Sequence, residues 1–423
     1  MQRHPIRQNA RVLTASLVGT AVEFYDFYIY ATAAALVIGP LFFPRESQSA
    51  QTLLAFMTFG LAFFARPVGA IAFGHFGDRV GRKSTLVASL MLMGGSTVLI
   101  AFLPTYAMAG WIAPALLCLL RFGQGFGLGG EWGGASLLAV ENAPPGWEAR
   151  FGSAPQLGAP VGFLFANGLF LLLSHWLSDA DFAAWGWRIP FLASAVLVAL
   201  GLWIRLKIGE TPAFREAMEH APPPSVPIGQ LMRHHAGAVI AGTAGVVACF
   251  AIFYLATTSS LNFATTQLGY SKQDFLAVQL GANTFLAVGI VLAGWWADKA
   301  GAVKVLGTGA ALTVLVGLGF GSGLGSGSLP VVFATLSLSL LVMGLVYGPL
   351  GGWLPTLYPV PVRYSGISVA FNAGGIIGGA LAPFAASWFA GVGGTPALGL
   401  FLTIAGALTF FGVRFAPRLS SSR

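Results

Sequence analysis

The stretch Arg121–Gly134, with the sequence RFGQGFGLGGEWGG, decides how the chain folds. It places an arginine and a glutamate inside a long apolar run, so it must keep its polar side away from lipid. At about 100° per residue of helix, its polar residues fall on one side and four of its glycines on the other. Glycines let a neighbouring membrane helix approach closely. The stretch therefore predicts a tightly packed helix whose polar side lines a cavity or holds a structural ion pair. The polar residues are Arg121, Gln124, Glu131 and Trp132.

The composition is that of a multi-pass membrane protein. The chain has 423 residues, of which 56% are hydrophobic and 9% are charged, and its mean hydropathy is +0.77. A soluble domain carries about 25% charged residues. Apolar stretches of about 20 residues, the length that crosses a bilayer as a helix, recur along the chain. We predict an all-α membrane protein with twelve spans, at 12–39, 52–76, 84–103, 109–140, 150–174, 188–207, 236–264, 274–297, 303–323, 329–349, 364–390 and 395–415.

The positions of the 22 Lys and Arg residues predict the topology. Only Arg45, Arg188 and Lys272 fall in loops on the side opposite the termini, and Arg66 and Arg121 fall inside spans. Loops rich in Lys and Arg face the cytoplasm. We therefore expect both termini in the cytoplasm. The formal charge of +8 is explained by this topology, and no nucleic-acid partner is expected.

A polar segment divides the spans into two sets of six. Residues 209–235 include the sequence HAPPPSVP. This composition predicts a cytoplasmic linker that is partly helical before its prolines and stiff through them. The predicted domains are thus an N-terminal bundle, 1–208, the linker, and a C-terminal bundle, 236–423.

The two halves repeat one motif. FGHFGDRVGRKS follows the second span and AGWWADKAGAVK follows the eighth. A repeat in the same orientation predicts two bundles related by an axis along the membrane normal, with a binding site between them. The first copy predicts a loop over 74–84 that acts as a gate between the bundles, or that only sets topology and caps a helix. The residues are Gly74, Asp78, Arg79, Gly81, Arg82 and Lys83, with Asp298 in the second copy.

These features together resemble the major facilitator superfamily. Within it, four stretches resemble the metabolite:H+ symporters, whose members include permeases for shikimate, α-ketoglutarate, citrate, and proline or betaine. The resemblance covers the whole chain in topology, and its motifs are specific only in the N-terminal half. It implies the major facilitator fold and a monomer in the bacterial inner membrane. The stretches are GTAVEFYDFYIY (Gly19–Tyr30), FFARPVGAIAFGHFGDRVGRKS (Phe63–Ser84), RFGQGFGLGGEWGG (Arg121–Gly134) and WGWRIPF (Trp185–Phe191).

The first span carries two acids, Glu23 and Asp26, one turn apart, with Tyr30 close by. Two carboxylates so close in a low dielectric cannot both ionise cheaply. One of them should hold a proton unless a buried arginine neutralises the pair. Acids inside a membrane are functional by default, so we expect proton coupling here, with Asp26 the stronger candidate. The alternative is a static cluster of buried ion pairs.

Two arginines lie within spans. Arg66 and Arg121 are permanently charged and can hold a carboxylate in a bidentate fork. Each is a candidate substrate anchor or a counter-ion for an acid. Glu131 lies about 15 Å along the helix axis from Arg121, which favours a proton exit or an inner gate. Because three acids and two arginines sum to −1, binding of an anion would favour uptake of a proton.

The C-terminal half offers only uncharged polar groups at mid-membrane. Each of them either hydrogen-bonds a substrate or joins two helices. Together with the N-terminal residues they complete the predicted substrate-binding set. That set is Arg121, Arg66, Gln124, Tyr30, Tyr254, Asn262, Asn283, Tyr347 and Asn372; the proton-coupling set is Asp26, Glu23 and Glu131.

We therefore expect a secondary active transporter that couples protons to the import of a small organic anion by alternating access. The substrate would be a mono- or dicarboxylate, with shikimate as one model. The alternatives are a proton-coupled importer of proline or betaine and a proton-driven exporter. No nucleophile–base pair, metal-ligand spacing or ATP-binding motif is present in the sequence, so we expect no enzyme activity and no cofactor. The expected partners are the anion, protons and the lipid bilayer.

Overall fold

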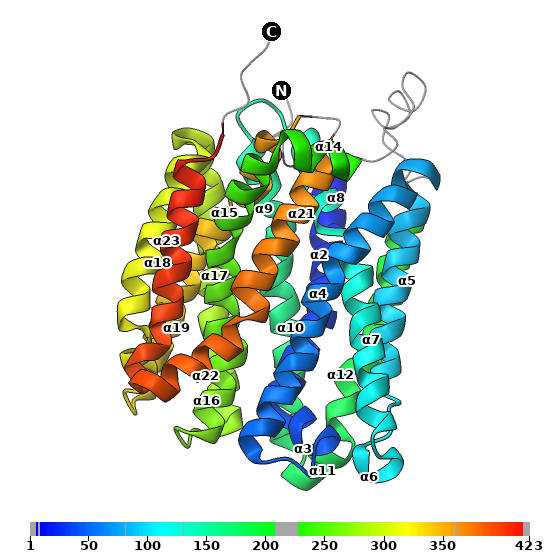
Figure 1. The fold of residues 1–423 in the computed structure, drawn as a ribbon, viewed down its shortest axis with the longest axis vertical. Coiled ribbons are helices and arrows are strands. Elements are labelled where there is room, and N and C mark those ends of the chain that lie inside the picture. The colour runs from blue at the N-terminus through cyan, green and yellow to red at the C-terminus, as the bar shows by residue number, and fades with distance from the viewer. Residues whose placement is uncertain are drawn as a thin grey trace.

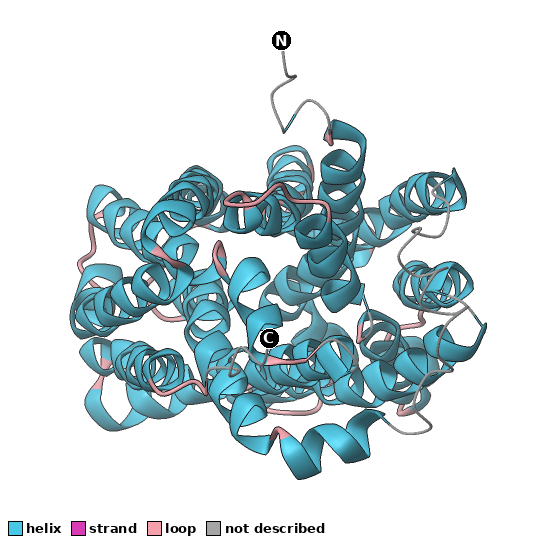
Figure 2. Ribbon diagram, turned by 90° about the horizontal axis from the view of Figure 1, so that it is seen from above, coloured by secondary structure: helices cyan, strands magenta, loops and turns pink. Residues whose placement is uncertain are grey.

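The structure is a computed structural model that describes residues 6, 9–80, 82–129, 131–207, 227–359 and 362–417. Within these ranges, the side chains at 11, 49, 74–80, 82–86, 204, 205, 207, 227 and 228 are not described. The described part of the chain is helical, and Figure 2 shows its helices joined by short loops.

The N-terminal half supplies the first six spans. Four of them are built from more than one helical segment. The elements are α2 (Ala10–Ala33), η1 (Ala34–Ile38), α3 (Gly39–Phe42), α4 (Gln48–Val80), α5 (Arg82–Ile100), α6 (Tyr106–Ala109), α7 (Ile112–Leu128), α8 (Glu131–Glu141), α9 (Glu148–Gln156), α10 (Gly158–Trp176), α11 (Asp179–Ala184), η2 (Gly186–Arg188) and α12 (Ile189–Lys207).

The C-terminal half begins with a short helix and then supplies six more spans. The elements are α14 (Pro227–His234), α15 (Ala236–Tyr254), η3 (Leu255–Ser259), α16 (Ser260–Thr266), α17 (Lys272–Ala300), α18 (Ala302–Leu324), α19 (Leu329–Tyr347), α20 (Leu350–Trp353), η4 (Leu354–Leu357), α21 (Arg363–Gly375), η6 (Ile376–Ala380), α22 (Ala382–Gly393), η7 (Thr395–Gly399) and α23 (Leu400–Arg414).

The predicted spans are confirmed. Eleven helices in the described ranges are long and apolar enough to cross a membrane, and Val87–Ile100 supplies a shorter apolar helix where the third span is predicted. Figure 1 shows them side by side, with the start of α2 and the end of α23 at the same end of the bundle. We call that end the terminal end and the opposite one the far end.

Two local predictions differ from the structure. The predicted loop over 74–84 is wrong where the backbone is described, because α4 continues to Val80 and α5 begins at Arg82. A continuing helix satisfies its own backbone groups, which offsets the low helix propensity of glycine. The end of the predicted linker forms α14, which begins at a proline, as helices often do. The linker before and through its prolines lies outside the described residues, apart from Pro227.

Glycines set the spacing of the N-terminal helices. A Cβ built on Gly127 would lie 2.8 Å from the Ser89 carbonyl oxygen of α5, as the predicted close packing requires. The approach to α4 is closer still. There, a Cβ on Gly125 would lie 2.1 Å from the Ala62 carbonyl oxygen. The α7 helix is therefore held between two neighbours at backbone distance.

The breaks within spans occur at matching positions in the two halves. The π-helical turn η1 in the first span begins at residue 34, and η3 in the seventh begins 221 residues later, at residue 255. The fourth span breaks after residue 128 and the tenth after residue 347. The fifth span breaks after residue 156, and η6 in the eleventh begins at residue 376. The repeat detected in one sequence motif therefore extends to the backbone of the whole fold.

The two halves meet along a contact surface that we call the seam. It is formed by α4, α8, α9 and α10 from one half and by α17, α20, α21 and η6 from the other. The acid-bearing α2 packs against α8, α9 and α10. The predicted site residues are thus divided between the interior of the N-terminal half and the contacts between the two halves.

Candidate functional site

Arg121 is buried inside the N-terminal half, and its guanidinium is bound by protein groups. Its Nε donates to the Thr58 carbonyl at 3.3 Å and its Nη2 to the Phe59 carbonyl at 3.2 Å, both in α4. Its Nη1 donates to Gln124 Oε1. The Tyr30 ring lies 3.7 Å from the guanidinium carbon, close enough for a cation–π contact. Arg121 therefore ties α7 to α4 and α2.

Asp26, like Arg121, is buried inside the N-terminal half. The Ser194 hydroxyl of α12 donates to its Oδ1. Gln124 Nε2 donates to the Asp26 carbonyl and to Thr97 Oγ1, both at 2.9 Å. Asp26 and Gln124 thus join four helices within one half, and Glu131 of α8 lies within electrostatic reach of Asp26.

The polar side predicted for the opening stretch is divided between two environments. Glu131 accepts a hydrogen bond from Ser89 of α5, inside the N-terminal half. Trp132 faces the seam, where its ring stacks on Phe371 of α21 with centroids 3.6 Å apart and planes at 6°. Its Nε1 donates to Gln156 Oε1 at 3.1 Å. Adjacent residues on a helix lie about 100° apart, so Glu131 and Trp132 at the two edges of the predicted polar side reach different surroundings.

Arg66, the other arginine proposed from the sequence as an anchor or a counter-ion, lies against two aromatic rings. Its guanidinium carbon lies 4.2 Å from the Phe27 ring centroid and 4.4 Å from that of Phe63. The side chain is 4% exposed, and its Nε has no hydrogen-bond partner. A buried donor without a partner costs about 1–3 kcal/mol, so this nitrogen is suited to bind an acceptor that is not part of the protein.

Four titratable side chains surround Arg66. Glu23 and Tyr28 come from α2, whereas Tyr254 and Tyr347 come from α15 and α19 in the other half; all four lie within electrostatic reach of the guanidinium. Glu23 also lies within reach of Tyr347. The Tyr347 hydroxyl is buried and has no hydrogen-bond partner. We call these five residues the Arg66 cluster. Its members come from both halves.

Aromatic rings line the space around the Arg66 cluster. Tyr28 stacks on Phe253 with centroids 4.7 Å apart, and Tyr254 packs edge-on against Phe63 at 5.5 Å. Such faces hold apolar parts of a ligand and also attract cations. The further rings in contact with these are Phe27, Phe59, Phe163 and Phe250.

Two of the predicted amides join the halves to each other along the seam. Asn283 Nδ2 of α17 donates to the Pro160 carbonyl of α10 at 2.8 Å. Asn372 Nδ2 of α21 donates to the Gly129 carbonyl at 3.1 Å. Both bonds cross the seam, which is the helix-joining alternative for these residues. The Asn283 Oδ1 has no hydrogen-bond partner.

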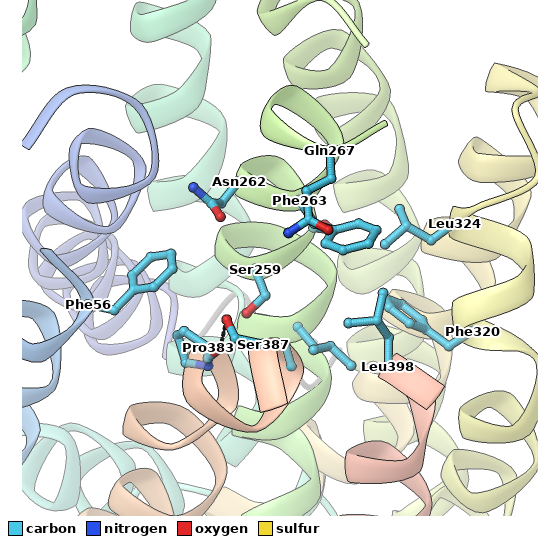
Figure 3. Close-up of a pocket in the computed structure, with 13 residues that line it drawn as sticks. Phe56, Ser259, Asn262, Phe263, Gln267, Phe320, Leu324, Pro383, Ser387 and Leu398 are labelled. Atoms are coloured by element: carbon cyan, nitrogen blue, oxygen red, sulfur yellow. Dashed lines mark hydrogen bonds between the residues drawn. The ribbon is translucent and has the colours of Figure 1, made fainter. Parts of the chain in front are cut away.

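The remaining predicted amide, Asn262, lies near the far end, where it lines a small pocket (Figure 3). Its Nδ2 donates to the Ala35 carbonyl of η1 at 3.4 Å. The pocket also contains the buried Ser259, the last residue of η3, whose hydroxyl has no hydrogen-bond partner. Phe320 and Pro383 provide apolar walls. Asn262 is therefore separate from the Arg66 cluster.

At the terminal end, Asp298 joins the halves. Its carboxylate accepts the Ala149 N–H at 2.8 Å and the Arg150 N–H at 3.3 Å, which caps α9, and it forms an ion pair with Arg150 Nε. We call this contact the Arg150–Asp298 latch. Beneath it, Ser153 donates to the Gly348 carbonyl at 3.1 Å. The predicted gate residues of the first copy have no described side chains; they are Gly74, Asp78, Arg79, Gly81, Arg82 and Lys83.

Sequence reasoning missed most of the residues that cross the seam. Arg150 and Gln156 lie in a segment predicted only as a span, and Phe371 lies among other apolar residues. One signal was available, because Asp298 is the repeat partner of Asp78 and an acid in that position needs a counter-ion. Across the described ranges, no group of three His, Cys, Asp or Glu side chains is arranged to hold a metal ion.

In the described ranges, eleven helices of membrane-spanning length and one shorter apolar helix, arranged in two halves around buried charges, are the architecture of a multi-pass membrane transporter. Residues 12–221 match the family described as sugar (and other) transporter. The inner membrane metabolite transport protein YhjE of Escherichia coli is 48% identical over 97% of this chain and 94% of its own length. The chain therefore belongs to the sugar (and other) transporters of the major facilitator superfamily.

More distant relatives differ in what they are named for. The shikimate transporter of Escherichia coli is 36% identical over 90% of this chain and 89% of its own length. The proline/betaine transporter of the same organism is 28% identical over 89% and 77%. Among solved structures, the proton:xylose symporter XylE bound to 6-bromo-6-deoxy-D-glucose superimposes with a TM-score of 0.79 at 17% identity, covering 98% of this chain and 97% of its own. The predicted major facilitator fold and multi-pass membrane location are confirmed.

Proposed function

We propose that the protein couples protons to the uptake of a small organic anion, and that the anion binds at the Arg66 cluster. The observation that carries this proposal is the buried Arg66 Nε without a hydrogen-bond partner; a tyrosine hydroxyl of the other half within its electrostatic reach, that of Tyr347, also lacks one. A carboxylate would accept from both donors at once. The name of the shikimate transporter, a relative that carries a hydroxylated monocarboxylate, supports this substrate class.

The anchor in this proposal is Arg66. Arg121, Gln124 and Tyr30 already have partners within the N-terminal half. They would position the helices around the substrate. Tyr254 and Tyr347 would bind the substrate from the C-terminal half. Asn262, Asn283 and Asn372 would act at the contacts between the halves.

Alternating access would proceed by rocking one half against the other. We place the halves at 1–208 and 236–423, joined by the linker 209–235, with both termini in the cytoplasm. The terminal end would then be the cytoplasmic end, and the Arg150–Asp298 latch would close it.

Uptake into proteoliposomes tests this function. The purified protein would be given labelled shikimate, 2-oxoglutarate, citrate, proline or glycine betaine, with and without an inward proton gradient. We expect gradient-dependent accumulation of a carboxylate, and loss of that accumulation in Arg66→Ala. Accumulation of none of the five compounds would refute the proposal. Saturation and counterflow distinguish a carrier from a channel.

A zwitterion such as glycine betaine is the second candidate. The specific observation in its favour is the set of aromatic faces next to Arg66, including the stacked pair Tyr28 and Phe253. Such faces hold quaternary ammonium groups while an arginine holds the carboxylate. The proline/betaine relatives agree with this reading. Preference for betaine over shikimate in the uptake panel would select it.

A further inference from the structure

We propose that the amide side chains of Gln279 and Asn283, on α17, select substrates that carry hydrogen-bond donors in addition to their carboxylate. This inference rests on the proposed function and deepens it, because it names the groups that the substrate presents away from Arg66. Each amide oxygen would accept one O–H or N–H donor of the substrate. A hydroxylated acid has such donors, whereas glycine betaine has none, so the inference favours the first candidate over the second.

The bonds made by the amide nitrogens fix the orientation of both side chains. Gln279 Nε2 donates to the Ala256 carbonyl at 3.1 Å and to the Thr257 carbonyl at 2.8 Å, both in η3. Asn283 Nδ2 donates to the Pro160 carbonyl of α10 at 2.8 Å. A carbonyl oxygen can only accept a hydrogen bond, so the nitrogen of each amide must face these groups. The amide oxygens are therefore directed away from them.

Both amide oxygens are buried acceptors without a donor. Gln279 is 1% exposed and Asn283 is 4% exposed, and neither side-chain oxygen has a hydrogen-bond partner in the protein. Polar atoms buried in this way require a partner. The two residues are four apart, so they lie on the same face of α17, with Cβ atoms about 5–6 Å apart. Two neutral oxygens are too few for a metal ion such as Mg²⁺ or Ca²⁺, which takes at least six, so the partner that fits them is a molecule with donors.

The carbonyls that hold the two amides lie next to aromatic rings. Pro160 precedes Phe163 by three residues in α10, and residues at this spacing are neighbours on a helix surface. Thr257 follows Phe253 by four residues and donates its hydroxyl to the Phe253 carbonyl at 2.6 Å. The ring centroids of Phe163 and Phe253 are 5.6 Å apart. The two amides are thus anchored on the elements that carry these rings, one element from each half.

A continuous series of contacts leads from these rings to Arg66. The Tyr254 ring packs edge-on against Phe253 at 5.3 Å and against Phe63 at 5.5 Å. The Phe63 ring centroid lies 4.4 Å from the Arg66 guanidinium carbon. The order along the seam is therefore a cation, an aromatic surface and a pair of acceptors. A molecule with a carboxylate, an apolar ring face and hydroxyl groups presents the complementary groups in the same order.

The selectivity follows from what a ligand without donors leaves behind. A site with buried polar groups rejects an analogue that cannot pair with them. Each hydrogen bond to such an acceptor changes the affinity roughly three- to tenfold. With two acceptors, wild type should bind the donor-bearing member of a matched pair about ten- to hundredfold more tightly than the other member.

Calorimetric binding to the purified protein tests this preference without a proton gradient. The first pair of ligands is shikimate and cyclohex-1-ene-1-carboxylate, which differ in their hydroxyl groups. The second pair is proline and N,N-dimethylproline, which differ in their N–H groups. Preference for shikimate identifies hydroxyls as the donors, and preference for proline identifies N–H groups. Equal affinities within both pairs would overturn the inference, and this comparison needs no variant.

Variants then assign the preference to the two amides. Gln279→Met and Asn283→Leu remove the oxygens with little change of volume, and each should lower the preference about three- to tenfold. The double variant should bind both members of a pair alike. Loss of packing alone would weaken both members equally, so the ratio distinguishes recognition from stability. A double variant that keeps the preference would show that the oxygens bind only water.

A matched control lies on the same helix. Gln273 donates through its amide to the Ser174 carbonyl of α10 and thus also joins the halves. Gln273→Met should leave the preference for the donor-bearing ligand unchanged. If it lowers the preference as much as Gln279→Met does, the effect belongs to contacts between the halves, and the assignment to the two amide oxygens is wrong.

The outcomes separate this inference from the proposed function. If wild type binds none of the four ligands and accumulates none of the uptake panel, the proposed function fails and the inference fails with it. If wild type accumulates a carboxylate but binds both members of each pair alike, only the selection by the amides fails.

Discussion

Removal of the Arg150–Asp298 latch should open the terminal end. The perturbation is Asp298→Ala. It takes away a carboxylate that is 2% exposed and that accepts two backbone N–H groups and one guanidinium N–H across the seam. These are contacts between the halves, so they exist only while the terminal end is closed. The substitution should therefore act on the equilibrium between closed and open states.

The magnitude follows from the geometry. A hydrogen bond to a charged group contributes about 1.5–3 kcal/mol, and breaking a fully buried ion pair costs about 3–5 kcal/mol. Because the Arg150 side chain is 27% exposed, water replaces part of what is lost. We therefore expect a shift of about 2–3 kcal/mol towards the open state, which is about 30- to 150-fold in population.

Thiol labelling measures this shift. In a protein whose native cysteines, Cys118 and Cys249, have been replaced, Ser153→Cys places a thiol beneath the latch. Ser153 is 5% exposed and bonds to the Gly348 carbonyl at 3.1 Å, so a maleimide reaches it only in the open state. When opening and closing are fast, the labelling rate follows the open population. The rate should rise by the same factor as that population.

A matched control comes from the same helix end. Lys299→Ala removes a charge next to Asp298 whose nitrogen lies 3.8 Å from the Trp295 ring of its own helix, so it should leave the labelling rate unchanged. If Asp298→Ala labels no faster than this control, the latch does not hold the terminal end closed. The reasoning from its geometry would then be refuted.

Three further outcomes are expected. Gly69→Ala should lower the thermal unfolding temperature of the purified protein, because a Cβ there would lie 1.9 Å from a carbonyl oxygen of α7. Overpacking of this kind costs about 1–3 kcal/mol. Gly168→Ala is the control: a Cβ there would have nothing within 4 Å, so the unfolding temperature should not fall. Arg121→Lys should reduce the yield of monodisperse protein at every pH, because one ammonium cannot reproduce three separately directed donors. Trp132→Leu should raise the labelling rate of the thiol beneath the latch about two- to tenfold. The variant loses the stacking contact with Phe371, which is worth about 0.5–1.5 kcal/mol. An unchanged rate would show that the stack does not stabilise the closed state.

Most of the fold could be predicted because the hydropathy and charge of each span can be read from its own residues, without knowledge of the rest of the chain. The spans and their number follow from the lengths of apolar stretches. The relation between the halves follows from a motif that recurs at Asp78 and Asp298. What escaped prediction were departures from regular helix, such as the break just before Glu131. The glycines that surround this break also serve close packing, so their presence alone does not locate it.

The candidate site was predicted by residue type but not by grouping. Glu23 and Asp26 lie one turn apart, and the sequence treats them as a pair, yet the structure gives them different neighbours. The sequence does not separate the roles of the two arginines either, because both carry the same charge. Only the packing of α4 distinguishes Arg66, at the seam, from Arg121, which is surrounded by carbonyl groups. Long-range contacts of this kind have no local sequence pattern.

The matching breaks in the two halves bear on how the protein arose. The turn at Ala34–Ile38 has the sequence AALVI, and its counterpart at Leu255–Ser259 has LATTS. The backbone bends at the same place while the side chains differ. Duplication of one ancestral six-helix unit, followed by divergence, produces this pattern. In that history the positions of the bends were inherited, whereas the side chains around them diverged.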